Sequence, residues 1–275
     1  MLRRIVCPID FSPAARNAVQ YAAKLAQLSG AGLELVYFQY HSSRALMAVA
    51  GRKKADAEAH VMKVARELEN LAAELNKMFS ISCGTGVETG EETLTEAIAG
   101  KAGPGDLIVA GTNGADDLFQ DFFGSNAYNL AVHAGCPVLV VPEQVEYRTL
   151  TEIVFAWDYD PESRPLFVRL KELAGMLGAQ ITFLHVSRHI SDVSKDIFNA
   201  LKEKVGEVFS EGEAKFERII APHPQDSIDE YMRGKESAVL ALAVQKGKML
   251  REILREKHGS EEELTAAYPV LVMHA

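Results

Sequence analysis

Three glycines and a serine at fixed spacing are the residues of this chain that best suit phosphate chemistry. Gly111, Gly114 and Gly124 are followed by Ser125 in the pattern G-x-x-G-x9-G-S. Glycine has no Cβ, so its backbone N–H can approach a phosphate oxygen closely. A loop that ends at the start of a helix adds unpaired N–H donors and the positive end of the helix dipole. Ser125 can donate from its hydroxyl or cap that helix.

The sequence around the motif supports this interpretation. An apolar run at 106–110 predicts a buried strand before the glycines, and 126–134 is compatible with a helix after them. Gly135 to Pro137 ends that helix, and a second apolar run covers Val138–Val141. A turn-rich connection that merely uses glycines is the alternative. However, the order of strand, glycine loop, helix and strand is the order that phosphate binding requires. The motif is neither a Walker A loop nor G-x-G-x-x-G.

Asp10 is a second candidate for ligand binding. The apolar run Arg4–Ile9 predicts a buried strand, and Asp10 falls at its carboxyl end. In open α/β sheets, ligands bind off the carboxyl ends of the strands. Ser12 and Pro13 look like the N-cap and the first residue of the next helix, so Asp10 could instead belong to the lead-in to that cap. Both roles are compatible, because Asp10 precedes the cap.

The glycine motif, the segment Cys136–Pro142 and the chain start Ile5–Ser12 together resemble the universal stress protein family across the N-terminal half. The resemblance implies a doubly wound α/β domain of the adenine nucleotide alpha hydrolase type, which holds ATP in the nucleotide-binding branch of the family. It implies that Asp10 lies beside the nucleotide and that backbone around Phe38 meets adenine. The nucleotide-binding residues expected are Pro8, Ile9, Asp10, Phe38, Ala110, Gly111, Gly114, Gly124, Ser125 and Asn126.

The order of elements predicts a fold of the α/β class. The first half alternates strands at 4–9, 33–38, 81–87, 106–110 and 138–141 with helices at 14–28, 56–78, 93–99 and 126–134. This alternation predicts a doubly wound parallel five-stranded sheet with helices on both faces. After a linker at 146–149 the pattern restarts, since Ile153–Asp158 repeats Ile5–Asp10. We therefore expect an internal duplication with domains at 1–145 and 151–275.

The second half keeps the repeat but departs at the motif. Its predicted strands are 153–158, 180–186, 215–220, 238–244 and 269–273, and its predicted helices are 166–177, 191–209 and 227–233. Gln245–Lys248 contains no G-x-x-G, and a helix-like segment at 249–258 leads to Gly259-Ser260. We therefore expect nucleotide binding in the first domain only. His185 and His189 are four residues apart, but such a metal pair needs a helix, and no metal site is expected.

Composition bounds the class of function. The 275 residues carry a net charge of −9, which argues against a nucleic-acid footprint. Cys7, Cys83 and Cys136 are scattered and odd in number, as in a cytosolic protein with reduced thiols. No signal peptide is evident, and no apolar run approaches the ~18 residues of a transmembrane helix. The expectation is a cytoplasmic protein that binds neither nucleic acid nor membrane.

These observations predict a stress-response protein with a regulatory or protective role that binds ATP or a related adenine nucleotide, with or without Mg²⁺. Asp116, Asp117 and Asp121 lie in the loop, where a carboxylate aimed at the phosphates would repel them or demand Mg²⁺. Two alternatives stay open: a weak ATP-hydrolysing or adenylate-transferring enzyme, for which no base is evident, and a scaffold whose second domain holds another small ligand. We expect the domains to pack as a pseudo-dimer through Val138–Val141 and Val270–Met273, and a homodimer is a further option.

Overall fold

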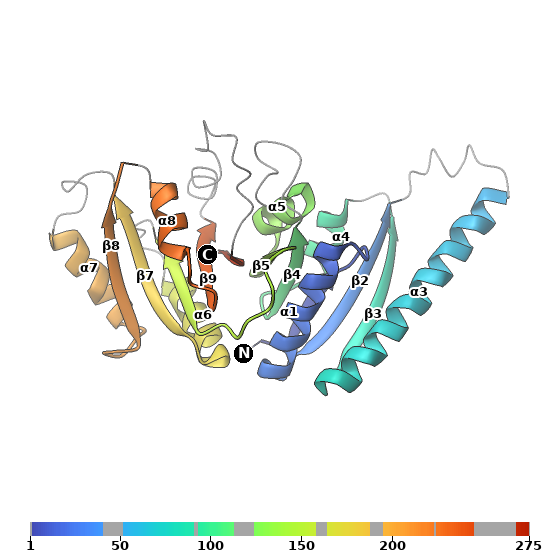
Figure 1. Ribbon diagram of the computed structural model, residues 1–275, viewed down its shortest axis with the longest axis horizontal. Coiled ribbons are helices and arrows are strands. Elements are labelled where there is room, and N and C mark those ends of the chain that lie inside the picture. Colours follow the sequence, from blue (N-terminus) through green and yellow to red (C-terminus); the bar gives the residue numbers. More distant parts are fainter. Residues whose placement is uncertain are drawn as a thin grey trace. The chain divides into compact units, whose positions relative to one another are not determined.

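The computed structural model describes residues 2–40, 52–90, 93–112, 124–157, 164–187, 195–222, 224–244 and 268–274. These residues divide into two compact units, with the change between Glu143 and Gln144. Each unit is a parallel sheet with helices packed on it (Figure 1). Among the described residues, no helix combines the length and apolarity needed to cross a membrane.

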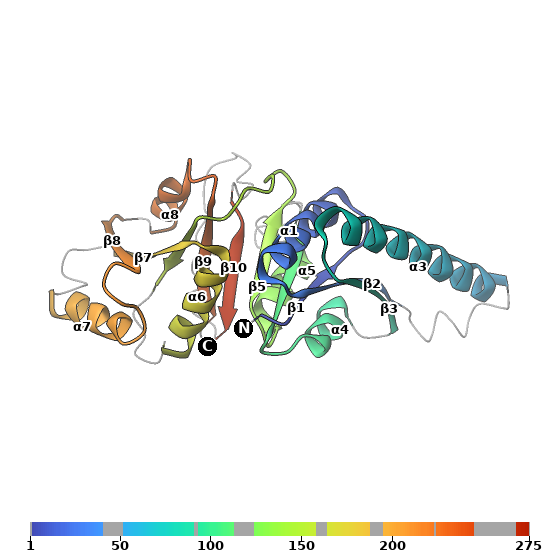
Figure 2. The ribbon, with the colours of Figure 1, turned by 90° about the horizontal axis from the view of Figure 1, so that it is seen from below.

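The first unit is a five-stranded sheet in the order β3-β2-β1-β4-β5, and all of its strands are parallel. Helices α1 and α3 cover one face, and α4 lies on the other (Figure 2). The elements are β1 (Arg4–Pro8), α1 (Pro13–Ser29), β2 (Gly32–Tyr40), α3 (Arg52–Phe79), β3 (Cys83–Gly90), α4 (Leu94–Lys101), β4 (Asp106–Thr112), α5 (Gly124–His133) and β5 (Val138–Pro142).

The strand order of the first unit reverses between β1 and β4. The chain runs outward from β1 to β2 and β3, and then returns to place β4 on the other side of β1. The loops that follow β1 and β4 therefore diverge in opposite directions at the carboxyl edge of the sheet. Such a switch point is where open α/β sheets leave a crevice for a ligand.

Helix ends in the first unit are fixed by the residues that local chemistry favours. Ser12 is the N-cap of α1, since its hydroxyl accepts a hydrogen bond from the N–H of Ala15 at 3.2 Å. Gly30 ends α1 with φ of 70°, a left-handed conformation that glycine adopts without strain. A capping box opens α4, where Thr93 and Glu96 bond each other's backbone N–H.

The second unit repeats this architecture in the strand order β10-β9-β6-β7-β8, again all parallel. Helices α6 and α7 cover one face and α8 the other (Figure 2). The elements are β6 (Glu152–Ala156), α6 (Arg164–Leu177), β7 (Gln180–Ser187), α7 (Lys195–Gly206), β8 (Ala214–Ile220), α8 (Pro224–Met232), β9 (Ala238–Val244) and β10 (Val270–His274). Aromatic rings fill the α6–α7 side, with Phe183 in edge contact with Trp157, Phe167 and Phe209.

The predicted fold class is confirmed, whereas several element boundaries were wrong. Helix α3 begins at Arg52 rather than at Asp56, and β3 begins at Cys83 rather than at Ile81. Helix α5 begins at Gly124 rather than at Asn126. The predicted helix at 249–258 lies outside the described residues.

Candidate functional site

Asp10 stands at the carboxyl end of β1, at the switch point. The strand pairing continues for one more bond, since the N–H of Ile9 donates to the carbonyl of Val36 at 2.9 Å. Ile9 is buried and Asp10 is exposed, and one Asp10 oxygen accepts from the N–H of Ser12 at 2.9 Å. This bond holds the carboxylate beside the start of α1 and leaves its other oxygen without a hydrogen-bond partner in the described part of the chain.

Phe11 holds an unusual backbone conformation directly beside Asp10. Its φ is 64° although it carries a side chain, and such strained residues cluster at functional sites. Arg16 supports the conformation, because its Nε donates to the Phe11 carbonyl at 3.1 Å and its guanidinium lies 5.5 Å from the ring centroid. Nothing in the hydrophobic pattern marks Phe11, so sequence reasoning missed it.

The end of β2 supplies an open backbone edge and an aromatic contact. Pairing of β1 with β2 stops at Pro8 and Val36. Since alternate residues of a strand turn their backbone groups to the same neighbour, Phe38 turns its N–H and C=O to the side of β1, beyond the point where β1 ends. Tyr37 lies 6.3 Å from Phe11 between ring centroids and contacts His60 through its hydroxyl at 3.5 Å.

Gln39 adds a polar group without a partner near the same end of β2. Its side-chain oxygen is buried and accepts no hydrogen bond in the described part of the chain. A buried acceptor left unpaired costs about 1–3 kcal/mol.

Gly111 at the end of β4 has a packing role. A Cβ at this residue would overlap the carbonyl of Ala14 and come within 2.9 Å of the N–H nitrogen of Ala15. Helix α1 can therefore lie close to β4 only because residue 111 lacks a side chain. Ala110, one residue earlier, is buried in the strand. The first glycine of the motif thus sets the distance between strand and helix beside the loop.

The remaining motif residues lie at or before the start of α5. Gly114 and the acidic residues Asp116, Asp117 and Asp121 are outside the described residues. Gly124, Ser125 and Asn126 form the first turn of α5, so Ser125 lies within the helix and is not the cap that precedes it. The first N–H groups of a helix have no partner inside the helix. This turn therefore presents donors suited to an anion.

Charged residues at the amino ends of the strands fix the two strands that flank the switch point. Arg4 of β1 donates to Asp106 of β4 at 2.7 Å, to Glu34 of β2 at 2.8 Å and to the carbonyl of Lys101 at 2.6 Å. Burial would raise the pKa of the Asp106 carboxyl, but bonds from Arg4 and the Gly103 N–H outweigh it and hold that pKa below its usual value.

The three cysteines are buried or partly buried thiols, and His185 belongs to the second unit. All three cysteines are free thiols. Burial raises the pKa of the Cys83 thiol to about 11 and raises that of Cys7 further, so neither is a thiolate at neutral pH. His185 lies on β7, where its Nδ1 is 3.2 Å from the carbonyl oxygen of Trp157. Within the described ranges, no three His, Cys, Asp or Glu side chains gather as a metal site would require.

Known structures share this architecture over nearly the whole chain. A universal stress protein from Archaeoglobus fulgidus matches with a TM-score of 0.71 at 14% identity, covering 98% of both chains. A Pseudomonas aeruginosa protein assigned to the same family matches at 0.59 and 20% identity, covering 99% of this chain and 93% of that one. The cytoplasmic domain of a prokaryotic cation chloride cotransporter matches at 0.51 and 10% identity, covering 98% and 94%. At these identities the likeness shows the fold alone.

The sequence itself gives the family. No curated protein sequence matches the chain, but the family model for universal stress proteins matches residues 1–142. That range contains β1 to β5, Asp10 and the whole glycine motif. The chain belongs to the universal stress protein family.

Proposed function

We propose that this chain binds ATP or a related adenine nucleotide at the carboxyl edge of its first sheet, and acts in the cytoplasm as a nucleotide-dependent regulator during stress. The observation that carries the proposal is the position of the candidate residues at the switch point. Asp10 follows β1, and the glycine motif links β4 to α5. Ligands of open α/β sheets bind where the strand order reverses, which supports a nucleotide site between the ends of β1 and β4.

The groups around this crevice complement the parts of an adenine nucleotide. Asp10 offers a carboxylate oxygen to a ribose hydroxyl or to the adenine amino group. Phe38 offers a backbone N–H and C=O, the pair that the edge of a purine ring requires. The first turn of α5 offers N–H donors to phosphate oxygens. Mg²⁺ would accompany the phosphates through their own oxygens and water.

Titration of the full chain with ATP by calorimetry tests the proposal. Gly124→Val should abolish binding, because a β-branched side chain would occupy space that a phosphate needs at the helix start. The matched control is Gly135→Val, just past α5, where an added Cβ meets open space; this variant should bind as the original chain does. Equal affinity in both variants would exclude the phosphate-loop assignment. Chromatography of the titrated mixture for ADP reports at the same time whether ATP is hydrolysed.

A further inference from the structure

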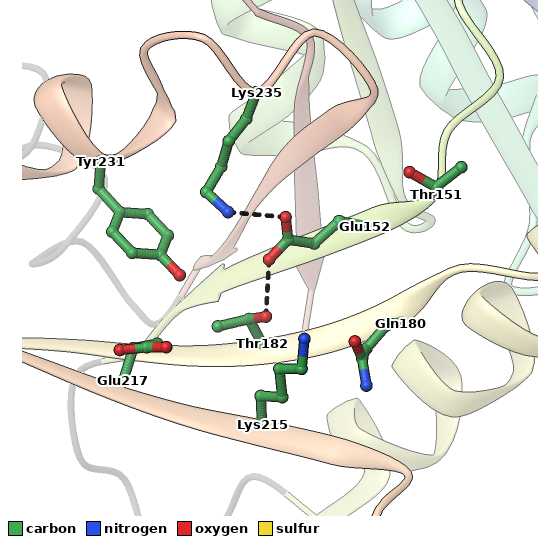
Figure 3. Close-up of a pocket in the computed structure, with 8 residues that line it drawn as sticks. All are labelled: Thr151, Glu152, Gln180, Thr182, Lys215, Glu217, Tyr231 and Lys235. Atoms are coloured by element: carbon green, nitrogen blue, oxygen red, sulfur yellow. Dashed lines mark hydrogen bonds and ion pairs between the residues drawn. The ribbon is translucent and has the colours of Figure 1, made fainter.

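A polar pocket of about 280 Å³ opens on the second unit at the amino ends of its strands (Figure 3). Glu152, the first residue of β6, lines it together with Thr182 of β7 and Lys215 and Glu217 of β8. It lies at the opposite ends of the strands from the edge that corresponds to the nucleotide site. Parallel sheets usually carry apolar residues on both faces, so three neighbouring strands with polar side chains on one face form an unusual surface.

One wall of the pocket is held rigidly by an ion pair. Lys235 donates to Glu152 at 2.8 Å, and the buried Thr182 hydroxyl donates to the other Glu152 oxygen at 2.7 Å (Figure 3). Burial would raise the pKa of Glu152, but these two bonds and the nearby Lys215 charge hold it below its usual value. Glu152 and Lys235 therefore stay ionised at neutral pH and satisfy each other.

The other wall carries two charged side chains that act on Glu152 and Lys235 only at longer range. Lys215 and Glu217 are exposed, and neither forms a hydrogen bond or an ion pair with any residue that the structure describes. They leave the same face of β8 two residues apart, which places their origins roughly 7 Å from each other along the strand. Tyr231 of α8 also lines the pocket, with the Lys235 ammonium 4.7 Å from its ring centroid. Burial, and then the Glu217 charge, raise the pKa of its phenol, so it remains a hydroxyl donor.

The first unit has different residues at the positions equivalent to those that line this pocket. The pairing registers place Glu152 where the first unit has Arg4, and Thr182 where it has Glu34. They place Lys215 and Glu217 where the first unit has Gly84 and Gly86.

In the first unit the charges at this position satisfy one another. Arg4 bonds Glu34 and Asp106, and Lys101 bonds Glu88 at 2.7 Å. A Cβ on Gly86 would already contact Glu34 and Lys101. The second unit therefore carries Lys215 and Glu217 where the first has glycine, and neither forms an ion pair with a residue that the structure describes.

We propose that this pocket binds a small zwitterion of the free α-amino acid class. The ligand's carboxylate meets the Lys215 ammonium, and its ammonium group meets the Glu217 carboxylate. The formal charges of Glu152, Glu217, Lys215 and Lys235 sum to zero, so the pocket favours neither a net anion such as a nucleotide nor a net cation. The volume lies at the lower limit for drug-sized ligands, ~300 Å³, which suits a molecule of amino-acid size.

A thermal-shift screen of the full chain against the twenty common free amino acids, followed by calorimetry of those that shift the midpoint, tests the proposal. Binding should weaken by about tenfold or more in Lys215→Met and in Glu217→Gln, since each removes one charge-assisted contact. The matched control is Glu211→Gln, an exposed carboxylate that does not line the pocket, and it should leave affinity unchanged. Lys215 and Glu217 form no hydrogen bond or ion pair with the described residues, and they act on Glu152 and Lys235 only at longer range, so both variants should change the unfolding midpoint only slightly.

The charge requirement is tested with analogues of the amino acid that binds. The analogue without the amino group and the analogue without the carboxylate should each bind at least about tenfold more weakly. If the amine-free acid binds as tightly, the pocket is a simple anion site and the proposal is wrong. Absence of saturable binding by any of the twenty would also overturn it. Gly124→Val should retain amino acid binding, so this result stands apart from the outcome of the nucleotide experiment.

Discussion

A side chain at residue 111 has no room beside α1. The overlap of its Cβ would be with the backbone of Ala14 and Ala15, and backbone cannot rotate away as a side chain would. Gly111→Ala should therefore push α1 off β4 and lower the free energy of unfolding by about 3 kcal/mol. Thermal or urea unfolding measures this, with Gly135→Ala as the control. An unchanged midpoint would show that α1 adjusts without cost and that Gly111 is free to serve the ligand alone.

Asp106 should make the first unit sensitive to acid. Its folded pKa is depressed, so its contribution is complete well above the unfolded carboxyl pKa of about 3.9 and is lost progressively as the pH falls below that value and through the lower folded pKa. Asp106→Asn should cost about 2 kcal/mol at pH 7, below the usual figure for a buried pair because Arg4 is partly exposed. Unfolding measured from pH 7 to pH 2 should show that the difference in free energy of unfolding between the original chain and Asp106→Asn shrinks below about pH 4. A gap that persists at pH 2 would mean that the ion pair is not its origin.

At the scale of the element, the first helix depends on its cap. Ser12 holds the N–H of Ala15, and α1 carries the close contact with β4. Ser12→Ala should lower the free energy of unfolding by about 1 kcal/mol, whereas Ser12→Gly should lower it by only about a few tenths of a kcal/mol. Denaturant unfolding of Ser12→Ala and Ser12→Gly measures the two costs, and the difference between them shows whether residue 12 acts as a helix cap. Equal costs for the two variants would argue against a capping role.

The elements themselves were predictable because their apolar residues repeat with the period of a helix or strand. The boundaries of the elements were less predictable where tertiary contacts determine them. Helix α3 is followed by Ser80 with φ of 54°, a position where glycine or asparagine would have signalled the stop. The Asn76 side chain then bonds the Cys83 backbone at 2.6 and 3.2 Å, so β3 starts two residues later than the apolar run indicates.

The candidate site was predictable where residue type alone carries the chemistry. Asp10 and the glycines were proposed as site residues because they follow strands, and strand ends meet at one edge of a parallel sheet. Phe11 and Tyr37 were missed because their contact joins residues that no periodicity relates. Lys215 and Glu217 lie two residues apart on one strand, as the sequence shows. That they line a pocket depends on the residues of the neighbouring strands, and only the pairing register identifies those residues.

At the scale of the whole molecule, the two units share one strand order and differ at opposite edges of their sheets. Asp106 pairs with Arg4 in the first unit, and Ala238 pairs with Glu152 in the second, so Asp106 and Ala238 occupy equivalent positions. Five residues further along, Ala243 of β9 is therefore the equivalent of Gly111 of β4. The first unit has the glycine motif after β4 at its carboxyl edge, and the second has Lys215 and Glu217 near its amino edge, where the first has glycines. Packing of the units through Val138–Val141 and Val270–Met273 stays a prediction from the sequence, which Val140→Lys would test by lowering the melting temperature.

The duplication leads to a prediction of stoichiometry: one ATP per chain, held entirely by the first unit. Ala243 carries the Cβ that has no room at Gly111, so the second unit cannot bring its first helix equally close to this strand. By sequence count from the start of each strand, Lys246 corresponds to Gly114 of the motif. Both lie outside the described residues, and the sequence predicts that a lysine there leaves less room for a loop N–H to reach a phosphate. Lys246 and Lys248 could attract an anion by charge, but such a site would weaken with salt.

Calorimetry at about 0.15 M salt, where exposed charges are screened beyond ~8 Å, should therefore give a stoichiometry near one, and Gly124→Val should reduce it to none. Two ATP molecules per chain, or one that survives Gly124→Val, would show that the second unit binds nucleotide without the glycines.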